Sequence, residues 1–386
     1  MRSLIAKELK TLIREPMVVM MIVMPVLVYA LSAPFYSGAA RQAEEAARLR
    51  GVRLALLSCH GGGLVLRLLA ASLRSANVSV DVVDKCSPVE VLEEGYDVAV
   101  AVNATGGRLR LEIYVGGDLA RLARTLALPG SLTSVLARAM SPGGNVSSRA
   151  YVLLNGRLWG FEELSSVYYT GVTMGYASLF ILFPAASLGA ALIGAEREER
   201  MLDVLLSLPV PRRSIALSKA VAALVVALLA AGSAFAGLFI LFSSLGLRLS
   251  LPSYYTPASL GLYTLSLASE SLLATALAML VGLFASTVRG AQSAAALVAF
   301  PALIPFLATL AGLPSSSLFA LAPYAASIYT GLSPILGLRP AALATLAQLA
   351  EAAAALLALA RLLESETAVT GPETLRRLLS RLRARR

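Results

Sequence analysis

The sequence predicts an α-helical polytopic membrane protein with six transmembrane helices and one inserted extracytoplasmic α/β domain. Of its 386 residues, 57% are hydrophobic and 15% are charged, against roughly 45–50% and about 25% in ordinary soluble domains. The mean hydropathy is +0.75. A soluble core cannot hide that much apolar surface in a chain of this length, so lipid must solvate much of it. One long segment breaks the apolar pattern with short alternating elements, which are typical of a small α/β domain.

Six apolar stretches are long enough to cross about 30 Å of hydrocarbon, which takes roughly 20 helical residues. They lie at 17–36, 167–195, 215–245, 257–288, 291–313 and 340–363. No small-residue cleavage site closely follows the first stretch, so we expect it to be retained as an anchor. Segment 314–339 is apolar but broken by prolines, which predicts a re-entrant or interfacial outer segment. Kinks are expected within the helices at Pro25, Pro184, Pro301 and Pro305.

The short loops predict the orientation. Basic residues gather before the first stretch, between the second and third, at Arg289 and in the tail 364–386, whereas the opposite short loops hold only Arg248 and Arg339. The positive-inside rule then predicts a multi-pass protein of the cell membrane with both termini in the cytoplasm and segment 37–166 outside. The net charge of +10 is thus explained by topology. Nucleic-acid binding is not expected, because no basic tract with interleaved aromatic residues is present.

The outer segment reads as strands alternating with helices on one sheet. Strands are expected at 52–57, 78–83, 97–103 and 108–115, and helices at 63–76, 88–94, 118–127 and 131–140. Three Asn-x-Ser/Thr sequons, which are candidate glycosylation sites, fall in this segment at Asn77, Asn103 and Asn145.

Both cysteines, Cys59 and Cys86, follow expected strands of this domain, where a disulfide would be geometrically plausible outside the cell. Free thiols are the alternative. The only histidine, His60, adjoins Cys59, but three ligands without a recognised spacing are a poor metal signature, so no metal site is expected. The run Gly61–Gly63 fits a strand-to-helix turn better than a phosphate-binding turn.

The sequence contains few residues or motifs that are typical of a catalytic site. No G-x-x-x-x-G-K-[ST] phosphate loop occurs, and a single histidine excludes most histidine-dependent catalysis. We therefore expect no catalytic residue and no cofactor in this chain. Energy for any transport would have to come from an ion gradient or from a partner.

The loop 196–214, between the second and third stretches, carries four carboxylates where basic residues are usual. A short amphipathic helix is expected there, with charged Glu196, Glu198, Glu199 and Asp203 beside an apolar face that includes Leu202, Leu205 and Leu206. It reads either as a solvated helix on the membrane surface or as a docking helix for a soluble protein.

The loop pattern Glu-x-Glu, Leu-Asp-x-Leu-Leu, Pro-x-x-Arg and a following Lys resembles the coupling-helix region of ABC type-2 permeases. Segment 1–16, with Lys-Glu-Leu and Arg-Glu-Pro, is similar to the amphipathic N-terminal helix of that class, and the outer α/β insertion resembles its sodium-efflux and drug-export branch. The pattern departs at Arg200-Met201, where the family usually has Gly-Thr.

The resemblance implies the permease subunit of an ATP-driven ABC exporter. It further implies a second, identical or similar permease copy and a separate ATPase that binds ATP and Mg²⁺. The carboxylates and leucines of the loop would contact that ATPase.

Three candidate intramembrane polar residues lie near the middle of these stretches: Glu270 in the fourth, and Gln348 and Glu351 in the sixth. A carboxylate at mid-bilayer costs about 2.5–3.5 kcal/mol on insertion scales. The glutamates could line a cation or proton path, or each could be protonated or hydrogen-bonded to a neighbouring helix. Two other functions remain open: a gradient-driven secondary transporter that uses these glutamates, and a membrane receptor that acts through its outer domain. The sequence does not predict the substrate.

Overall fold

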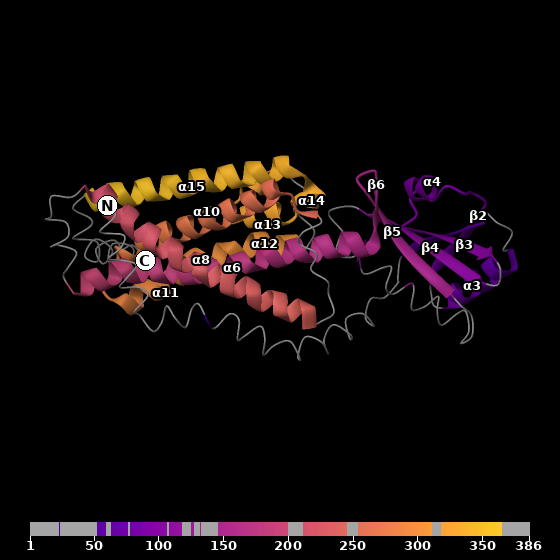
Figure 1. The fold of residues 1–386 in the computed structure, drawn as a ribbon, viewed down its shortest axis with the longest axis horizontal. Helices are drawn as coiled ribbons and strands as arrows, with labels where there is room; N and C mark the ends of the chain where they lie inside the picture. Colours follow the sequence, from indigo (N-terminus) through magenta and orange to yellow (C-terminus); the bar gives the residue numbers. More distant parts are fainter. Residues whose placement is uncertain are drawn as a thin grey trace, which may run out of the picture. The chain divides into compact units, whose positions relative to one another are not determined.

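The structure is a computed structural model, and it divides the chain into two compact units, each considered by itself (Figure 1). The sheet unit comprises the described residues from Val52 to Tyr168 together with Leu310, and the helical unit comprises Val23, Tyr169–Thr309 and the described residues from 318 onward. The structure describes residues 23, 52–58, 63–75, 78–105, 108–117, 125–126, 132, 146–199, 211–244, 254–310 and 318–364. The first predicted transmembrane stretch therefore lies outside the described residues except at Val23, as do segment 1–16 and the tail from 365.

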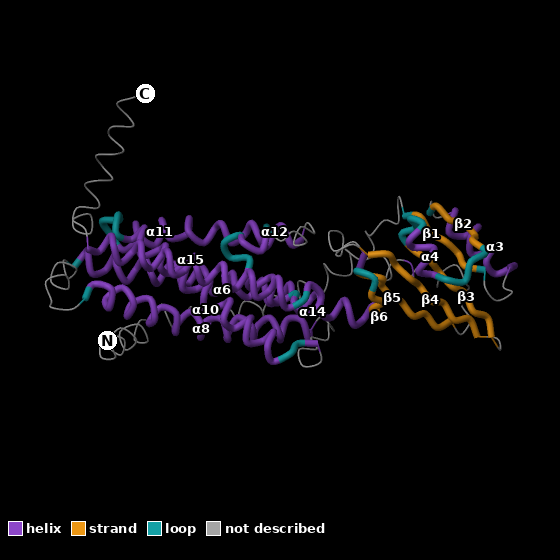
Figure 2. Tube along the Cα trace, turned by 90° about the horizontal axis from the view of Figure 1, so that it is seen from above, coloured by secondary structure: helices purple, strands orange, loops and turns teal. Residues whose placement is uncertain are grey.

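The sheet unit contains a six-stranded mixed sheet in the order β2-β1-β3-β4-β5-β6 (Figure 2). The strands are β1 (Arg53–Leu57), β2 (Ser79–Val83), β3 (Val98–Thr105), β4 (Arg108–Gly117), β5 (Val146–Leu154) and β6 (Arg157–Gly160). Strand β1 runs parallel to both β2 and β3, β3 is antiparallel to β4, β4 is parallel to β5, and β5 is antiparallel to β6. This sheet is the α/β part of the fold that the sequence predicts.

Alternation along β1 builds a core on each side of the sheet. Leu54 and Leu56 pack with helix α3 (Gly63–Ser75), whereas Ala55 and Leu57 pack with helix α4 (Pro88–Glu93). Successive strand residues point to opposite faces, so the two helices cover opposite faces of the sheet (Figure 1). The near-continuous apolar run of β1 is what a strand buried on both faces requires.

Strands β5 and β6 are absent from the sequence-based expectation, which placed only four strands in this unit. They are joined by Asn155-Gly156, whose φ angles are 52° and 74°. Positive φ at both central residues is the hallmark of a type I′ hairpin turn, for which Asn-Gly is the preferred pair. The signal was therefore present in the sequence. The flanking strand signals are weak, because β6 has four residues and the polar run Ser147-Ser148-Arg149 follows the first residue of β5.

The helical unit is built from long helices with short ones between them (Figure 2). The helices are α6 (Phe161–Glu198), α8 (Arg212–Ser244), α10 (Pro257–Gly282), α11 (Val288–Ala299), α12 (Leu303–Leu310), α13 (Ala326–Gly331), α14 (Ser333–Leu336) and α15 (Leu338–Glu364), with 3-10 turns η2 (Phe300–Ala302) and η3 (Phe319–Leu321). Among the described residues, four helical stretches are long and apolar enough to cross a membrane: α6, α10, Val288–Thr309 and α15. The chain is thus a mostly helical protein with several membrane-capable helices.

Two expected spans differ in detail from the helices observed. The expected span 257–288 stops at Gly282, because Thr287 is extended and caps a new helix by accepting a hydrogen bond from the Gly290 amide at 3.1 Å. Threonine is a preferred N-cap residue. The expected span 291–313 begins earlier, at Val288, and the turn η2 interrupts it where Pro301 removes a backbone donor. Pro184, by contrast, lies within the continuous helix α6.

The described part of segment 314–339 contains only short helices. Every residue of α13 is buried, so the protein itself surrounds this broken backbone. That is the condition under which non-helical backbone is tolerated at membrane depth.

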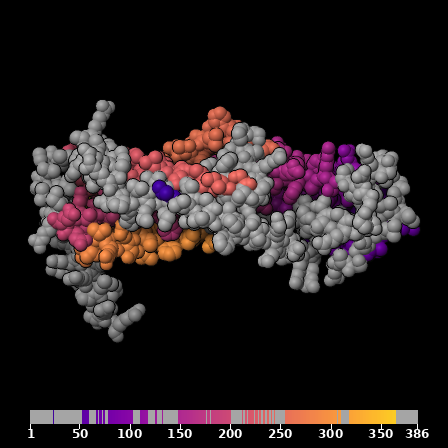
Figure 3. Space-filling model, turned by 60° about the horizontal axis from the view of Figure 1, so that its bottom comes forward, coloured from indigo at the N-terminus to yellow at the C-terminus, as the bar shows by residue number. Residues whose placement is uncertain are grey.

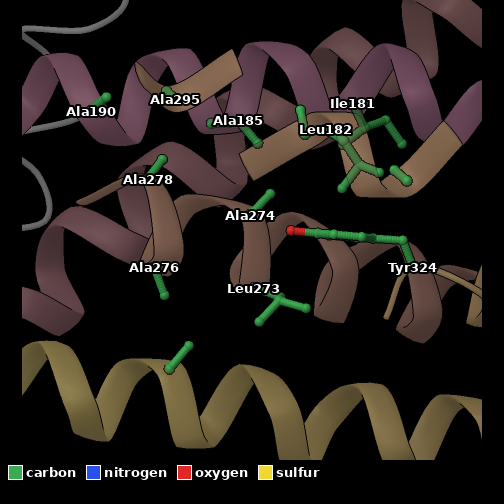
Figure 4. Packing of buried hydrophobic residues seen from close by; sticks show 14 of the residues in the cluster. Ile181, Leu182, Ala185, Ala190, Leu273, Ala274, Ala276, Ala278, Ala295 and Tyr324 are labelled. Atoms are coloured by element: carbon green, nitrogen blue, oxygen red, sulfur yellow. The ribbon is translucent and has the colours of Figure 1, made fainter. Parts of the chain in front are cut away.

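The core of the helical unit is rich in alanine. In Figure 4, Ala185 of α6 and Ala274 of α10 face each other across the interface, and both are fully buried. Small residues let transmembrane helices approach closely. Large apolar side chains are exposed along α11, η2 and α12, part of whose surface is visible in Figure 3. There Leu297, Phe300, Ile304 and Leu307 are 52–71% exposed, as expected of a surface that lipid or another apolar partner covers.

Candidate functional site

The end of α6 is joined to α8 by a buried ion pair. Lys219 of α8 contacts Oε1 of Glu196, and the two side chains are only 1% and 16% exposed. A buried pair contributes little net stability over apolar residues, but leaving one partner alone costs about 3–5 kcal/mol. The pair joins the helices on either side of segment 200–210, because Glu196 lies in α6 before the segment and Lys219 lies in α8 after it.

The same end of α6 also contacts the start of α11. Oε2 of Glu198 accepts a hydrogen bond from the Val288 amide at 2.9 Å. This amide belongs to the first turn of α11, where backbone donors have no partner within the helix and negative charge is favoured. Gly194 allows the close approach, because a Cβ there would lie 3.1 Å from Cβ of Ala291 and 3.2 Å from Cα of Val288.

The predicted docking residues divide into three groups. Glu196 and Glu198 make contacts within the helical unit, and Glu199 is exposed after the last residue of α6. Leu202, Asp203, Leu205 and Leu206 lie outside the described residues, so their role stays a prediction. Sequence reasoning missed Lys219 as a buried partner and the start of α11 as a hydrogen-bond donor.

A second polar cluster is buried in the middle of the helical unit. Glu270 of α10 is 1% exposed, and its Oε1 accepts a hydrogen bond from the Ser327 amide, in the first turn of α13, at 2.7 Å. The Ser327 hydroxyl in turn donates to the Ser178 hydroxyl of α6 at 3.0 Å. Glu270 therefore ties α13 to α10, and Ser327 extends the link to α6.

Gln348 of α15 holds the residue that leads into α13. Its Oε1 accepts a hydrogen bond from the Tyr324 amide at 2.8 Å. Tyr324 has a φ of 64°, an uncommon value for a bulky residue that costs on the order of 1–3 kcal/mol. The bond from Gln348 stabilises that conformation. The Tyr324 side chain is buried (Figure 4).

Tyrosine hydroxyls complete this cluster. Tyr255 donates to the Gly331 carbonyl oxygen at 2.7 Å, and Tyr263 donates to the Met174 carbonyl oxygen at 2.9 Å. Oε2 of Glu351 is buried without a hydrogen-bond partner among the described residues, as are Oε2 of Glu270 and Nε2 of Gln348. Of the three intramembrane polar residues predicted, two thus have identified structural partners.

We expect Glu270→Leu to destabilise the protein, whereas Glu270→Gln is tolerated. Leucine would leave the buried Ser327 amide without an acceptor, which costs about 1–3 kcal/mol, but glutamine keeps an acceptor oxygen at the same reach. Thermal unfolding of the purified protein in detergent, followed by size-exclusion chromatography, measures both. Equal damage from the two variants would show that the carboxyl group, and not merely an acceptor, is needed.

The sheet unit offers few candidate ligands. Cys86 is exposed after β2, whereas Cys59 and His60 lie outside the described residues, so the disulfide stays a prediction. Among the residues that the structure describes, no group of three histidine, cysteine, aspartate or glutamate side chains could hold a metal ion. Of the sequons, Asn103 lies in β3, paired with Arg110 of β4, and Asn77 and Asn145 lie outside the described part.

One aromatic pair lies on the sheet itself. Tyr114 of β4 stacks on Tyr151 of β5 with ring centroids 5.2 Å apart, and its hydroxyl donates to Glu112 at 3.0 Å. Burial first, and the bond to Glu112 second, raise the pKa of Tyr114 to about 12. The phenol is therefore neutral at physiological pH, and this pair stabilises the sheet.

Comparison with known proteins identifies the family. A family model described as "ABC-2 family transporter protein" matches residues 2–364 of the chain. Neither the curated proteins nor the solved structures that were searched contain a match. The family match confirms the resemblance to ABC type-2 permeases, but it leaves the sodium-efflux and drug-export branch a prediction. Because the match covers nearly the whole chain, this protein belongs to the ABC-2 family of transporter proteins and is a multi-pass membrane permease.

Proposed function

We propose that this chain is the membrane subunit of an ATP-driven exporter, which couples ATP hydrolysis in a separate ATPase subunit to outward movement of a substrate. The observation that carries the proposal is the family match over residues 2–364. The sequence contains no phosphate loop of its own, so ATP and Mg²⁺ would be bound by the partner.

The geometry at the end of α6 supports this function. The ion pair between Glu196 and Lys219 braces the two helices from which segment 200–210 arises. A docking segment transmits the movement of an ATPase to the membrane helices only if the helices at its two ends are held together. Otherwise the segment itself would bend. Glu199 and the predicted apolar face of Leu202, Leu205 and Leu206 would form the surface that meets the ATPase.

The proposed assembly has two permease copies, identical or similar, and two ATPase subunits in the cell membrane. Both termini and segment 200–210 would face the cytoplasm, in agreement with the basic short loops on that side. The sheet unit would lie outside.

Co-purification tests the proposal. The permease would be co-expressed with a candidate ABC ATPase, and Glu199→Arg/Leu205→Asp would be compared with wild type. We expect the variant to bind the ATPase at least about tenfold more weakly, a change of about 1.4 kcal/mol, because both the charge and the apolar contact are reversed. Arg339→Glu, an exposed change at the predicted outer end of α15, is the control and should bind normally. If no ATPase co-purifies with the wild-type protein, the proposed function fails.

A further inference from the structure

The last turn of α6 contacts two different helices. Glu196 and Glu198 are two positions apart, and at 3.6 residues per turn their side chains leave α6 in nearly opposite directions. Glu196 contacts Lys219 of α8, and Glu198 accepts from the Val288 amide of α11. The residues closest to segment 200–210 thus connect α6 on both sides.

The contact with α11 has two parts on one face of α6. Gly194 and Glu198 are four residues apart, so they lie on the same side of the helix. Gly194 allows α11 to approach, because a Cβ there would lie closer to Ala291 and Val288 than ordinary van der Waals contact permits, and Glu198 adds the hydrogen bond. A displacement of this end of α6 would therefore act directly on the first turn of α11.

Helix α11 has the form of a short independent segment. It begins after the extended residue Thr287 and ends at the 3-10 turn η2, which contains Pro301. A 3-10 interruption within a longer helix is often a functional hinge, because its hydrogen bonding is poorer than that of an α-helix. The turn η2 is therefore the candidate hinge between α11 and α12.

We propose that Glu198 is a positioning residue that couples segment 200–210 to α11, so that movement of the docking segment is transmitted to the fifth predicted span. This inference rests on the proposed function and deepens it, because it names the element inside the membrane that the ATPase moves. It also changes the role expected for Glu198, from a contact of the ATPase to an internal link. The contact between Glu196 and Lys219 makes α8 move together with this end of α6.

Two conservative substitutions separate the two roles of Glu198. Glu198→Gln keeps an acceptor oxygen at the same reach but removes the charge. Glu198→Asp keeps the charge but shortens the side chain by one methylene, which withdraws the acceptor from the Val288 amide. An internal link should survive in the glutamine variant and fail in the aspartate variant, whereas a charge contact with the ATPase predicts the reverse.

The experiment uses the full permease–ATPase complex in lipid nanodiscs, with and without ATP and vanadate. Hydrogen-exchange mass spectrometry would follow peptides that cover 200–210 and the start of α11, and ATP hydrolysis would be measured on the same samples. In the wild type and in Glu198→Gln, both peptides should change their exchange on trapping. In Glu198→Asp the 200–210 peptide should still respond, but the α11 response and the stimulation of ATP hydrolysis should be lost. Glu162→Asp, the same shortening of an exposed carboxylate near the start of α6, is the matched control and should behave as the wild type does in both peptides.

Two results would overturn the inference. If α11 responds normally in Glu198→Asp, the link does not carry the movement. If Glu198→Gln loses the α11 response together with ATPase binding, Glu198 is a docking residue. Failure of the proposed function looks different, because then the wild-type protein itself binds no ATPase and neither peptide responds, and the inference falls with it.

Discussion

Replacing Gly331 by alanine is expected to lower the stability of the helical unit by at least about 1–3 kcal/mol, the usual cost of overpacking. A Cβ at Gly331 would lie 2.6 Å from the carbonyl oxygen of Gly171, and a Cβ at Gly171 would lie 2.7 Å from the carbonyl oxygen of Gly331. The atoms in the way belong to the backbone of α6 and α13, so no side-chain rotation can relieve the clash. Gly171→Ala should therefore be as damaging as Gly331→Ala.

The control for this prediction is another helical glycine. Among the described residues, nothing outside its own turn of α10 lies within 4 Å of where a Cβ of Gly261 would be. Alanine is favoured over glycine within a helix by about 0.8–1.0 kcal/mol, so Gly261→Ala should leave stability unchanged or raise it. The measurement is the temperature at which half of the detergent-purified protein loses its monodisperse size-exclusion peak. A Gly331→Ala variant as stable as Gly261→Ala would mean that α6 and α13 are not in backbone contact.

The second large effect is expected at the buried ion pair. Lys219→Met should destabilise the protein by about 3–5 kcal/mol, because it removes the cation that contacts the largely buried carboxylate of Glu196. The double variant Lys219→Met/Glu196→Gln should recover most of that loss, since it removes both charges of the buried pair. Lys219 is the only buried lysine among the described residues, so the effect is specific to this position.

Comparison with an exposed ion pair gives the matched control. Lys85 and Glu94 of the sheet unit form a contact of the same kind, but their side chains are 42% and 47% exposed. Exposed pairs contribute little to stability, so Lys85→Met should leave the unfolding temperature unchanged. If Lys219→Met behaved like Lys85→Met, water would have to reach the pair at the end of α6.

Local patterns were sufficient to predict most elements. The apolar runs marked the helices α6, α8, α10 and α15, because lipid or protein must cover such runs whatever their neighbours are. The Thr287 cap and the Asn155-Gly156 turn are local signals too, and they were overlooked because each is only one or two residues long. Their omission shifted the end of one expected span and left β5 and β6 unassigned.

The sequence by itself determined that this is a membrane protein with an inserted α/β domain and a set of polar residues within or beside apolar helices. It could not determine what those polar residues contact. Glu270 pairs with Ser327, 57 positions away, and Glu198 with Val288, 90 positions away. Periodicity and composition report only on the environment of a few neighbouring residues, whereas these partners are chosen by how whole helices pack. For that reason the sequence shows only that Glu198 is a surface carboxylate, whereas the fold shows that this exposed carboxylate accepts a hydrogen bond from the first turn of α11.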